Sequence, residues 1–155
     1  MIIEMKEDTA NLNVPAKKAV RAVIIKDDAV LLMHLAASNT YVLPGGGVLD
    51  EEPLDEALKR EVKEETGHTV RTAVETLIIK EYHKDINREH HIYRIETDDR
   101  QSPINMTSEE ISLGMKPNFI PLEEALNMLA ENRGTYKYSQ AIETRELLAI
   151  LYSLD

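Results

Sequence analysis

Apolar and polar positions in the first quarter of the chain follow the short-period pattern of β-strands. After a polar lead-in over residues 1–17, residues 18–26 are rich in valine, isoleucine and alanine. Asp27 and Asp28 follow as a tight turn, and residues 29–35 are again apolar. Two such runs joined by two turn-forming residues predict a β-hairpin.

A short extended run over residues 40–43 ends at Pro44 and is followed by Gly45, Gly46 and Gly47. Glycine has no Cβ and tolerates positive φ, so a loop of consecutive glycines lets the backbone approach a ligand closely. The alternative is a plain turn that connects a strand to a helix, and the two interpretations are compatible.

The clearest helix follows over residues 54–65, which are nearly all good helix formers. Pro53 suits the first helical position, and Gly67 stands where a left-handed C-terminal cap is expected. The sequence therefore predicts both ends of this helix.

The rest of the chain alternates between strand-like and helix-like patterns. Gly134 is expected to close a helix over residues 121–131, and Ser139 to cap a last helix within residues 135–155 that turns Ile142, Leu148, Ala149 and Tyr152 toward the core. Before these helices we expect strands over residues 69–82, 90–96 and 113–120, a turn over residues 83–89 and a polar loop over residues 97–110. The order predicts one α/β domain over residues 1–155, with a mixed sheet flanked by helices.

Composition narrows the class of protein. The chain has 155 residues, no cysteine, and 28 acidic against 18 basic residues, a net charge of −10. Without cysteine there is no disulfide or thiolate chemistry, and without a long apolar run we expect no membrane span but a soluble, cytoplasmic protein. No lysine- and arginine-rich cluster is present, which argues against broad nucleic-acid binding.

Half of the net charge lies in residues 50–67, where eight acidic residues oppose three basic ones. On a helix of 3.6 residues per turn, Glu61, Glu64 and Glu65 continue the apolar stripe of Leu54 and Leu58. Carboxylates on that side point toward the body of the domain and lie near the negative end of the helix dipole, which is costly. A divalent cation would offset this cost, and ligation by carboxylates alone favours Mg²⁺ or Mn²⁺.

Mg²⁺ in proteins commonly shares its ligands with substrate phosphates, so the acidic helix indicates phosphate or pyrophosphate chemistry. Backbone amides around Gly45, Gly46 and Gly47 supply the complementary anion-binding part. The plain alternative for the three glutamates is a solvated helix face.

The same segment resembles the signature of the Nudix hydrolases, Gly-x5-Glu-x7-Arg-Glu-U-x-Glu-Glu-x-Gly-U, where U is a bulky aliphatic residue. Every charged and glycine position of this signature is matched, by Gly46, Glu52, Arg60, Glu61, Glu64, Glu65 and Gly67. The one departure is His68, which replaces the final aliphatic residue. We refer to residues 46–68 as the signature. The resemblance extends over most of residues 18–130.

The resemblance implies a Nudix-like α/β/α sandwich and Mg²⁺-dependent hydrolysis of a nucleoside diphosphate linked to another moiety. Glu61, Glu64 and Glu65 would be metal ligands, and Glu64 or Glu65 would help to activate water. Arg60, paired with Glu52, would orient a signature glutamate.

Four points stay open at this stage. An acid outside the signature, Glu110 or Glu109, is expected to complete the metal site, with Glu96, Asp98 and Asp99 as competitors. The substrate is a nucleoside triphosphate or a nucleotide sugar, and residues 97–110 are expected to decide between them. A non-catalytic module that senses a nucleotide metabolite is the alternative function. Family precedent suggests a homodimer, but the chain length does not determine the oligomeric state.

Overall fold

The hairpin predicted from the sequence lies at the centre of the structure. Strand β2 (Ala16–Lys26) turns at Asp27 and Asp28, which both have positive φ, and returns as β3 (Ala29–Leu35). The computed structural model describes residues 1–154.

The hairpin belongs to an eight-stranded sheet in which parallel and antiparallel neighbours are mixed. The path across the sheet is β1-β6-β7-β2-β3-β4, with β5 beside β2 and β8 beside β3. The pairs β1–β6 and β2–β7 are parallel, and the other pairs are antiparallel. The remaining strands are β1 (Ile2–Lys6), β4 (Thr40–Val42), β5 (Gly45–Gly47), β6 (His68–Tyr82), β7 (Asn87–Gln101) and β8 (Met115–Pro121).

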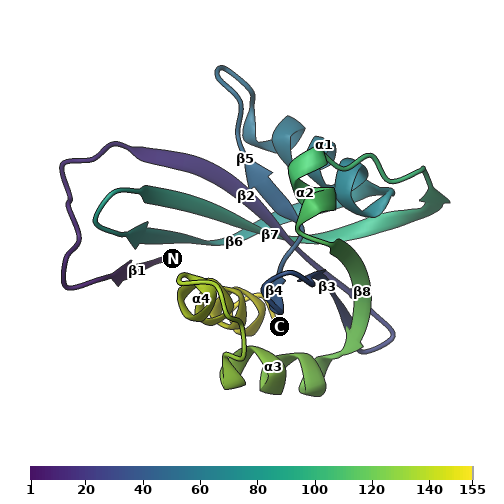
Figure 1. Cartoon of the computed structure of the whole chain (residues 1–155). Coiled ribbons are helices and arrows are strands. Elements are labelled where there is room, and N and C mark those ends of the chain that lie inside the picture. The colour runs from purple at the N-terminus through teal and green to yellow at the C-terminus, as the bar shows by residue number, and fades with distance from the viewer. Residues whose placement is uncertain (155) are drawn as a thin grey trace.

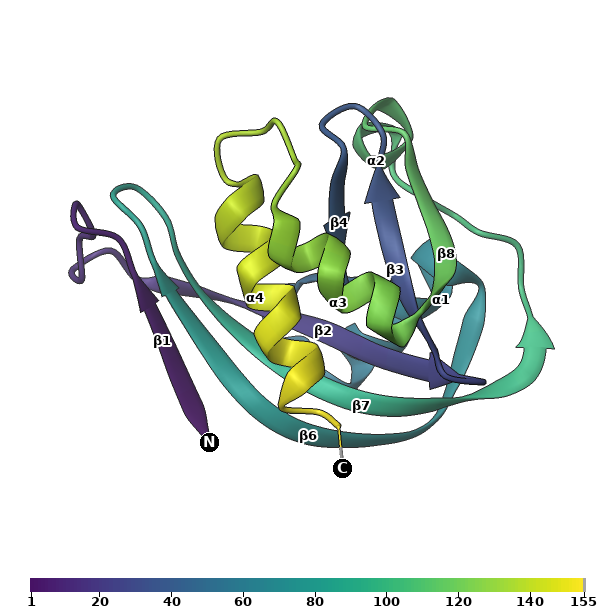
Figure 2. The same cartoon turned by 90° about the horizontal axis from the view of Figure 1, so that it is seen from below.

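Helices cover both faces of the sheet, as Figures 1 and 2 show. Helix α1 (Leu54–Thr66) packs on one face, and α3 (Leu122–Glu131) and α4 (Ser139–Leu151) pack on the other. Successive residues of β2 serve the two cores, since Ala22 packs with the α1 side and Val23 with the α3 and α4 side. The predicted α/β/α sandwich with a mixed sheet is confirmed.

Both ends of α1 follow from its sequence. Gly67 ends the helix with φ +73°, as expected, whereas Pro53 is the N-cap and not the first helical residue, which is Leu54. A Cβ at Gly67 would lie 2.2 Å from the carbonyl oxygen of Ser102, so both the backbone conformation and the close approach require glycine. This packing fixes the segment after β7 against the end of α1.

The edge strands are more extensive than the sequence predicts. Residues 1–17 contain strand β1, which pairs in parallel with β6, a partner more than seventy residues away that local pattern does not reveal. The expected turn over residues 83–89 is shorter, because β7 begins at Asn87. Strand β7 also continues to Gln101 through residues of low β-propensity, held by its pairing with β6.

Three further local expectations are corrected. The polar loop over residues 97–110 contains the end of β7 and the start of α2 (Ser108–Ser112), which has a capping box between Thr107 and Glu110. Asn132, with φ +52°, ends α3 in place of Gly134. Ser139 is the first residue of α4 and not its cap, and its hydroxyl is 2.7 Å from the Thr40 hydroxyl.

The buried face of α4 differs from the expected one. Ala149 is buried as expected, but Ile142 and Leu148 are only half-buried and Tyr152 is exposed. Charged residues lie on the buried side instead: Glu143, Arg145 and Glu146. Within residues 1–154, no helix has the length and apolar character needed to cross a membrane.

Candidate metal and anion site

The signature glutamates divide between two environments on α1. Glu61 and Glu65 are buried, with 9% and 1% of their surface exposed, and they continue the stripe formed by Ala57 and Leu58. The Glu64 side chain is 34% exposed and lies 3.5 Å from the Arg60 guanidinium. The structure thus turns two of the three glutamates fully toward the domain.

A third carboxylate comes from α2. Oxygen atoms of Glu61, Glu65 and Glu110 all lie within 4.8 Å of one another, and we call these residues the acidic cluster. Helix α2 lies in front of α1 in Figure 1, and its Glu110 carboxylate reaches the two glutamates of the helix that carries the signature. An all-carboxylate set of this spacing suits a hard divalent cation such as Mg²⁺ or Mn²⁺.

Backbone hydrogen bonds hold α2 in this position. The Ser102 N–H donates to the Gly67 carbonyl at 2.7 Å, and the Asn105 N–H donates to the Glu64 carbonyl at 2.8 Å. The capping box then starts α2, because the Thr107 N–H donates to the Glu110 carboxylate at 2.8 Å. Hydrogen bonds to the C-terminal end of α1 therefore help to position the Glu110 carboxylate beside Glu61 and Glu65.

Arg60 links the signature into one unit. Its Nε and Nη2 atoms donate to the two carboxylate oxygens of Glu52 at 2.8 and 2.9 Å, and its Nη1 donates to Glu61 at 2.9 Å. Its Nη2 also donates to the Gly47 carbonyl at 3.1 Å. Because Arg60 is held by a bidentate carboxylate, it can fix the Glu61 carboxylate in orientation.

The three glycines form the short strand β5 rather than an open loop, and they lie directly against the acidic cluster. The Gly45 N–H donates to the Glu65 carboxylate at 2.7 Å. A Cβ at Gly46 would lie 2.7 Å from a carboxylate oxygen of Glu61, whereas a Cβ at Gly47 would meet nothing within 4 Å. The close approach expected of these glycines is made to the acidic side chains of α1.

The electrostatics of the site depend on which carboxylates have a cationic partner. Burial raises the pKa of Glu65 to about 8, against the opposing effect of its hydrogen bond from Gly45. Burial also raises the pKa of Glu61 above its ordinary value, although Arg60 opposes this. In contrast, the hydrogen bonds from Arg60 and from the Leu49 N–H lower the pKa of Glu52 to about 2. Among residues 1–154, the three carboxylates of the acidic cluster therefore share only the Arg60 contact with Glu61, whereas Glu52 is fully paired with Arg60.

A cavity of about 350 Å³ opens on the other side of β5. Gly45 lines it together with Arg21, which faces Gly45 across the β2–β5 pair. Arg21 donates to the Leu43 carbonyl at 3.3 Å, and among residues 1–154 its guanidinium has no carboxylate in ion-pair contact. Tyr136 and Tyr138 also line this cavity, with ring centroids 5.5 Å apart.

The floor of this cavity is a buried charge network centred on α4. Arg145 donates to Glu81 of β6 at 2.8 Å and to Glu146 at 2.7 Å, and Glu146 accepts the Leu43 N–H at 2.6 Å. His90 lies 3.0 Å from Glu81, and burial together with the charge of Arg145 lowers its pKa to about 3. The network ties α4 to the strand end that leads into β5.

Neither Arg21 nor the charge network of α4 was predicted from the sequence. Glu143, Glu146 and Ala149 follow one another at intervals of three, so a stripe containing carboxylates was visible there, as it was on α1. Arg21 gave no signal, because one basic residue in an apolar strand is ordinary. Arg21 becomes a candidate ligand-binding residue only because it lines the cavity.

The other acids considered as metal ligands, and the aromatic residues considered for base stacking, lie outside the acidic cluster. Glu96 pairs with Arg71, and Asp98 lies 3.3 Å from Arg100, so neither joins the acidic cluster. Exposed Glu109 is also outside it. The rings considered for base stacking are dispersed: Tyr41 stacks on His34, Tyr93 is buried beneath α1, and Phe119 is in edge contact with His68.

His68, the one departure from the signature, is a buried residue at the start of β6. Its Nδ1 lies 3.1 Å from the Thr66 hydroxyl, and its ring centroid lies 6.0 Å from that of Phe119. The histidine therefore fills the aliphatic position of the signature by packing and hydrogen bonding. It does not join the acidic cluster.

Comparison with known proteins gives a consistent result. The family model of the NUDIX domain matches residues 15–141. A NUDIX hydrolase from Nitrosomonas europaea superposes with a TM-score of 0.66 at 18% identity, over 85% of this chain and 90% of that one. A MutT NUDIX hydrolase from Burkholderia pseudomallei gives 0.55 at 21% identity, over 70% of this chain and 85% of that one. No curated protein matches the chain.

A further solved structure is described as an ADP compounds hydrolase. It superposes with a TM-score of 0.55 at 18% identity, over 88% of this chain and 75% of that one. At sequence identities this low, the superpositions establish a shared fold and nothing more.

Proposed function

The chain belongs to the Nudix family of hydrolases that act on phosphoanhydride bonds, and from this premise we propose that it is a Mg²⁺-dependent pyrophosphohydrolase. Its substrate is a nucleoside diphosphate linked to another moiety. The observation that carries the proposal is the acidic cluster, in which α1 and α2 gather three carboxylates beside β5. Nudix enzymes generally use divalent metal ions, and this donor set fits one.

Glu61, Glu65 and Glu110 would hold the metal ion. When bound, Mg²⁺ neutralises charge on the bridging phosphates and lowers the pKa of a coordinated water. Arg60 keeps the Glu61 carboxylate in place through the contacts described above, and Glu52 keeps Arg60 in place. Arg60 and Glu52 are thus positioning residues.

Glu64 has a separate role in this proposal. It is the most accessible of the signature glutamates on α1 and lies outside the acidic cluster, next to Arg60. A carboxylate there is free to take a proton from the attacking water as its oxygen bonds to phosphorus and the bridging oxygen leaves. Glu64 would then act as a base, and direct ligation by Glu64 is the alternative.

The cavity beside β5 supports a nucleotide substrate. Arg21 offers a cation without an acidic partner for phosphate, and Tyr136 and Tyr138 offer aromatic surface for a base. Gly45 separates this cavity from the acidic cluster, and within the described part of the chain β5 pairs only with β2, so the phosphates of a bound substrate would pass the free edge of β5 to reach the metal ion. A nucleotide sugar and a nucleoside triphosphate both fit this description.

Hydrolysis of a substrate panel tests the proposal. The protein is incubated with nucleoside triphosphates, nucleotide sugars and dinucleoside polyphosphates, with Mg²⁺ or with EDTA, and the products are identified by mass. We expect cleavage of one class with Mg²⁺ only. Tight binding of a nucleotide without turnover of any compound would support the sensing module instead.

Replacing Gly46 by alanine is expected to lower turnover by about 10²-fold, since a displacement of roughly 1 Å in a catalytic group has this effect. The new methyl group would push the Glu61 carboxylate aside, while the backbone φ of residue 46 remains allowed. Because the displaced atoms end a flexible side chain, the melting temperature should hardly change. Gly47→Ala is the matched control, and equal activity of the two variants would contradict the account.

Replacing Glu110 by glutamine is expected to raise the Mg²⁺ concentration for half-maximal turnover by about tenfold or more. Glutamine can still accept the Thr107 N–H, so the capping box and α2 are kept. Glu109→Gln removes the same charge from the exposed neighbour and should leave the Mg²⁺ dependence unchanged. If both variants behave alike, Glu110 is not a ligand.

A further inference from the structure

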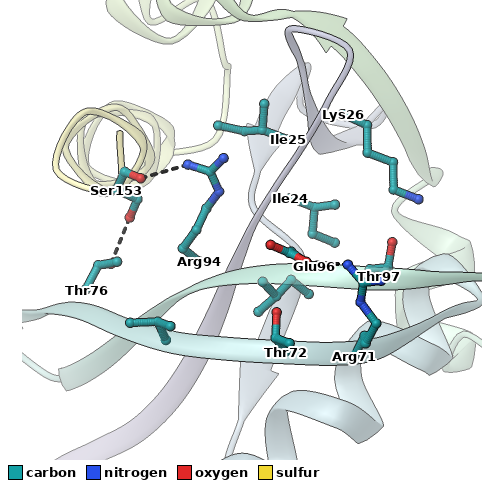
Figure 3. Close-up of a pocket in the computed structure, with 12 residues that line it drawn as sticks. Ile24, Ile25, Lys26, Arg71, Thr72, Thr76, Arg94, Glu96, Thr97 and Ser153 are labelled. Atoms are coloured by element: carbon teal, nitrogen blue, oxygen red, sulfur yellow. Dashed lines mark hydrogen bonds and ion pairs between the residues drawn. The ribbon is translucent and has the colours of Figure 1, made fainter. Parts of the chain in front are cut away.

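A second cavity, of about 530 Å³, lies away from the acidic cluster where β2 and β7 diverge. Their parallel pairing ends at Ile24 and Ile95, after which β2 turns into the hairpin and β7 continues alongside β6. Figure 3 shows side chains from β2, β6, β7 and the segment after α4 around this space. No residue of the acidic cluster or of β5 lines it.

The cavity is rich in positive charge, although the chain as a whole carries a net charge of −10. Lys26, Arg71 and Arg94 line it, together with a single acidic residue, Glu96. Glu96 is paired with Arg71. Among residues 1–154, neither Lys26 nor Arg94 has a carboxylate in ion-pair contact, and Arg94 donates only to the Ser153 carbonyl at 2.9 Å. Two cationic groups therefore line the cavity, and Figure 3 shows Arg94 and Lys26 on opposite sides of it.

A buried hydroxyl in the same cavity lacks a partner. Thr97 is 8% exposed, and its Oγ1 makes no hydrogen bond within residues 1–154. In Figure 3 the Thr97 oxygen points toward the side of the cavity where Lys26 lies. Thr76, by contrast, is bonded to the Ser153 hydroxyl at 2.8 Å. A buried hydroxyl without a partner is costly, and a ligand oxygen would satisfy it.

The remaining wall is apolar. Ile24, Ile25, Val74 and Ile95 line the cavity beside the charged groups. The volume exceeds what one phosphate needs and lies in the range of small-molecule sites. A cation and a hydroxyl, Lys26 and Thr97, beside aliphatic surface match a phosphate group joined to an organic part.

We propose that this cavity is a second ligand site, which binds a phosphorylated small molecule with its phosphate at Lys26 and the Thr97 hydroxyl and its organic part on the isoleucine wall. The site is independent of the acidic cluster and needs no metal ion. It adds a binding function to the proposed hydrolase.

Titration of ¹⁵N-labelled protein in EDTA tests this site by NMR, with inorganic phosphate and phenyl phosphate as probes. EDTA removes divalent metal, so the hydrolytic site does not hold the probes through a cation. We expect saturable shifts of amides in residues 71–76 and 94–97, and tighter binding of phenyl phosphate, by about tenfold, because its ring is buried. Shifts only at residues 45–47, or none that saturate, would overturn the proposal.

Two variants and a matched control sharpen the test. Lys26→Met should weaken binding of both probes by about tenfold, as loss of a charge-assisted contact does. Thr97→Val should weaken binding too, yet leave the melting temperature unchanged or higher, because it removes an unpartnered hydroxyl. Lys17→Met removes an exposed charge from the same strand and should have no effect. Unchanged affinity in both cavity variants would also overturn the proposal.

Discussion

Replacing Glu65 by glutamine is expected to reduce turnover by about 10²- to 10³-fold, because a catalytic metal ion contributes several kcal/mol to the rate and this change removes a ligand charge. The fold should survive, since the glutamine oxygen can still accept the Gly45 N–H. Steady-state hydrolysis of the substrate identified by the panel, measured at several Mg²⁺ concentrations, gives the result.

The stability of the same variant separates a functional role from a structural one. Without metal, burial together with the nearby carboxylates of Glu61 and Glu110 holds the pKa of Glu65 at about 8, so Glu65 is mostly protonated at neutral pH and glutamine resembles this neutral form. The melting temperature of Glu65→Gln in EDTA should therefore equal or exceed that of the wild type, and Mg²⁺ should raise it less. Glu56→Gln, on the exposed side of the same helix, is the control for both measurements. Loss of activity together with loss of stability in EDTA would contradict this assignment.

Replacing Arg145 by methionine is expected to lower the free energy of unfolding by about 3–5 kcal/mol, the usual cost of leaving buried charges without their partner. Glu81 and Glu146 would remain in the interior, at 4% and 0% exposure, without the guanidinium that now bridges them. Chemical denaturation followed by circular dichroism measures the change.

Arg133→Met is the matched control, because Arg133 pairs with Glu131 at 2.7 Å but is 74% exposed. An exposed ion pair of this kind contributes about 0–1 kcal/mol. If both arginine variants lose similar stability, the buried network does not carry the role given to it. A functional effect of Arg145→Met beyond that on stability is expected to act through the Glu146 contact with Leu43, next to β5.

Elements whose structure depends on neighbouring residues could be predicted from the sequence. The hairpin around Asp27 and Asp28, helix α1 and its Gly67 cap were predicted from residue types within a few positions of one another. The inward direction of Glu61 and Glu65 was also readable, since a helix has a fixed period. Glu64 is rotated far enough around α1 to reach Arg60 and solvent instead.

Features that depend on distant partners were not readable from one sequence. Strand β1 forms because β6 offers an edge, and the charges on α4 are buried because β6 supplies Glu81. Helix α2 is an intermediate case, since Thr107 and Glu110 have the spacing of a capping box although the segment resembled a loop. The local signal was present there, but only contacts with α1 give it a place in the site.

Manganese titration of metal-free, ¹⁵N-labelled protein tests the central claim most directly, because bound Mn²⁺ broadens the NMR signals of nearby amides. If the acidic cluster is the metal site, the amides of residues 45–47 and 61–65 lose intensity first in the wild type, and the effect weakens in Glu65→Gln. Amides of residues 71–76, at the second cavity, keep their intensity. Broadening that begins elsewhere, or that is the same in Glu65→Gln, would contradict the proposed metal site and the hydrolytic mechanism built on it.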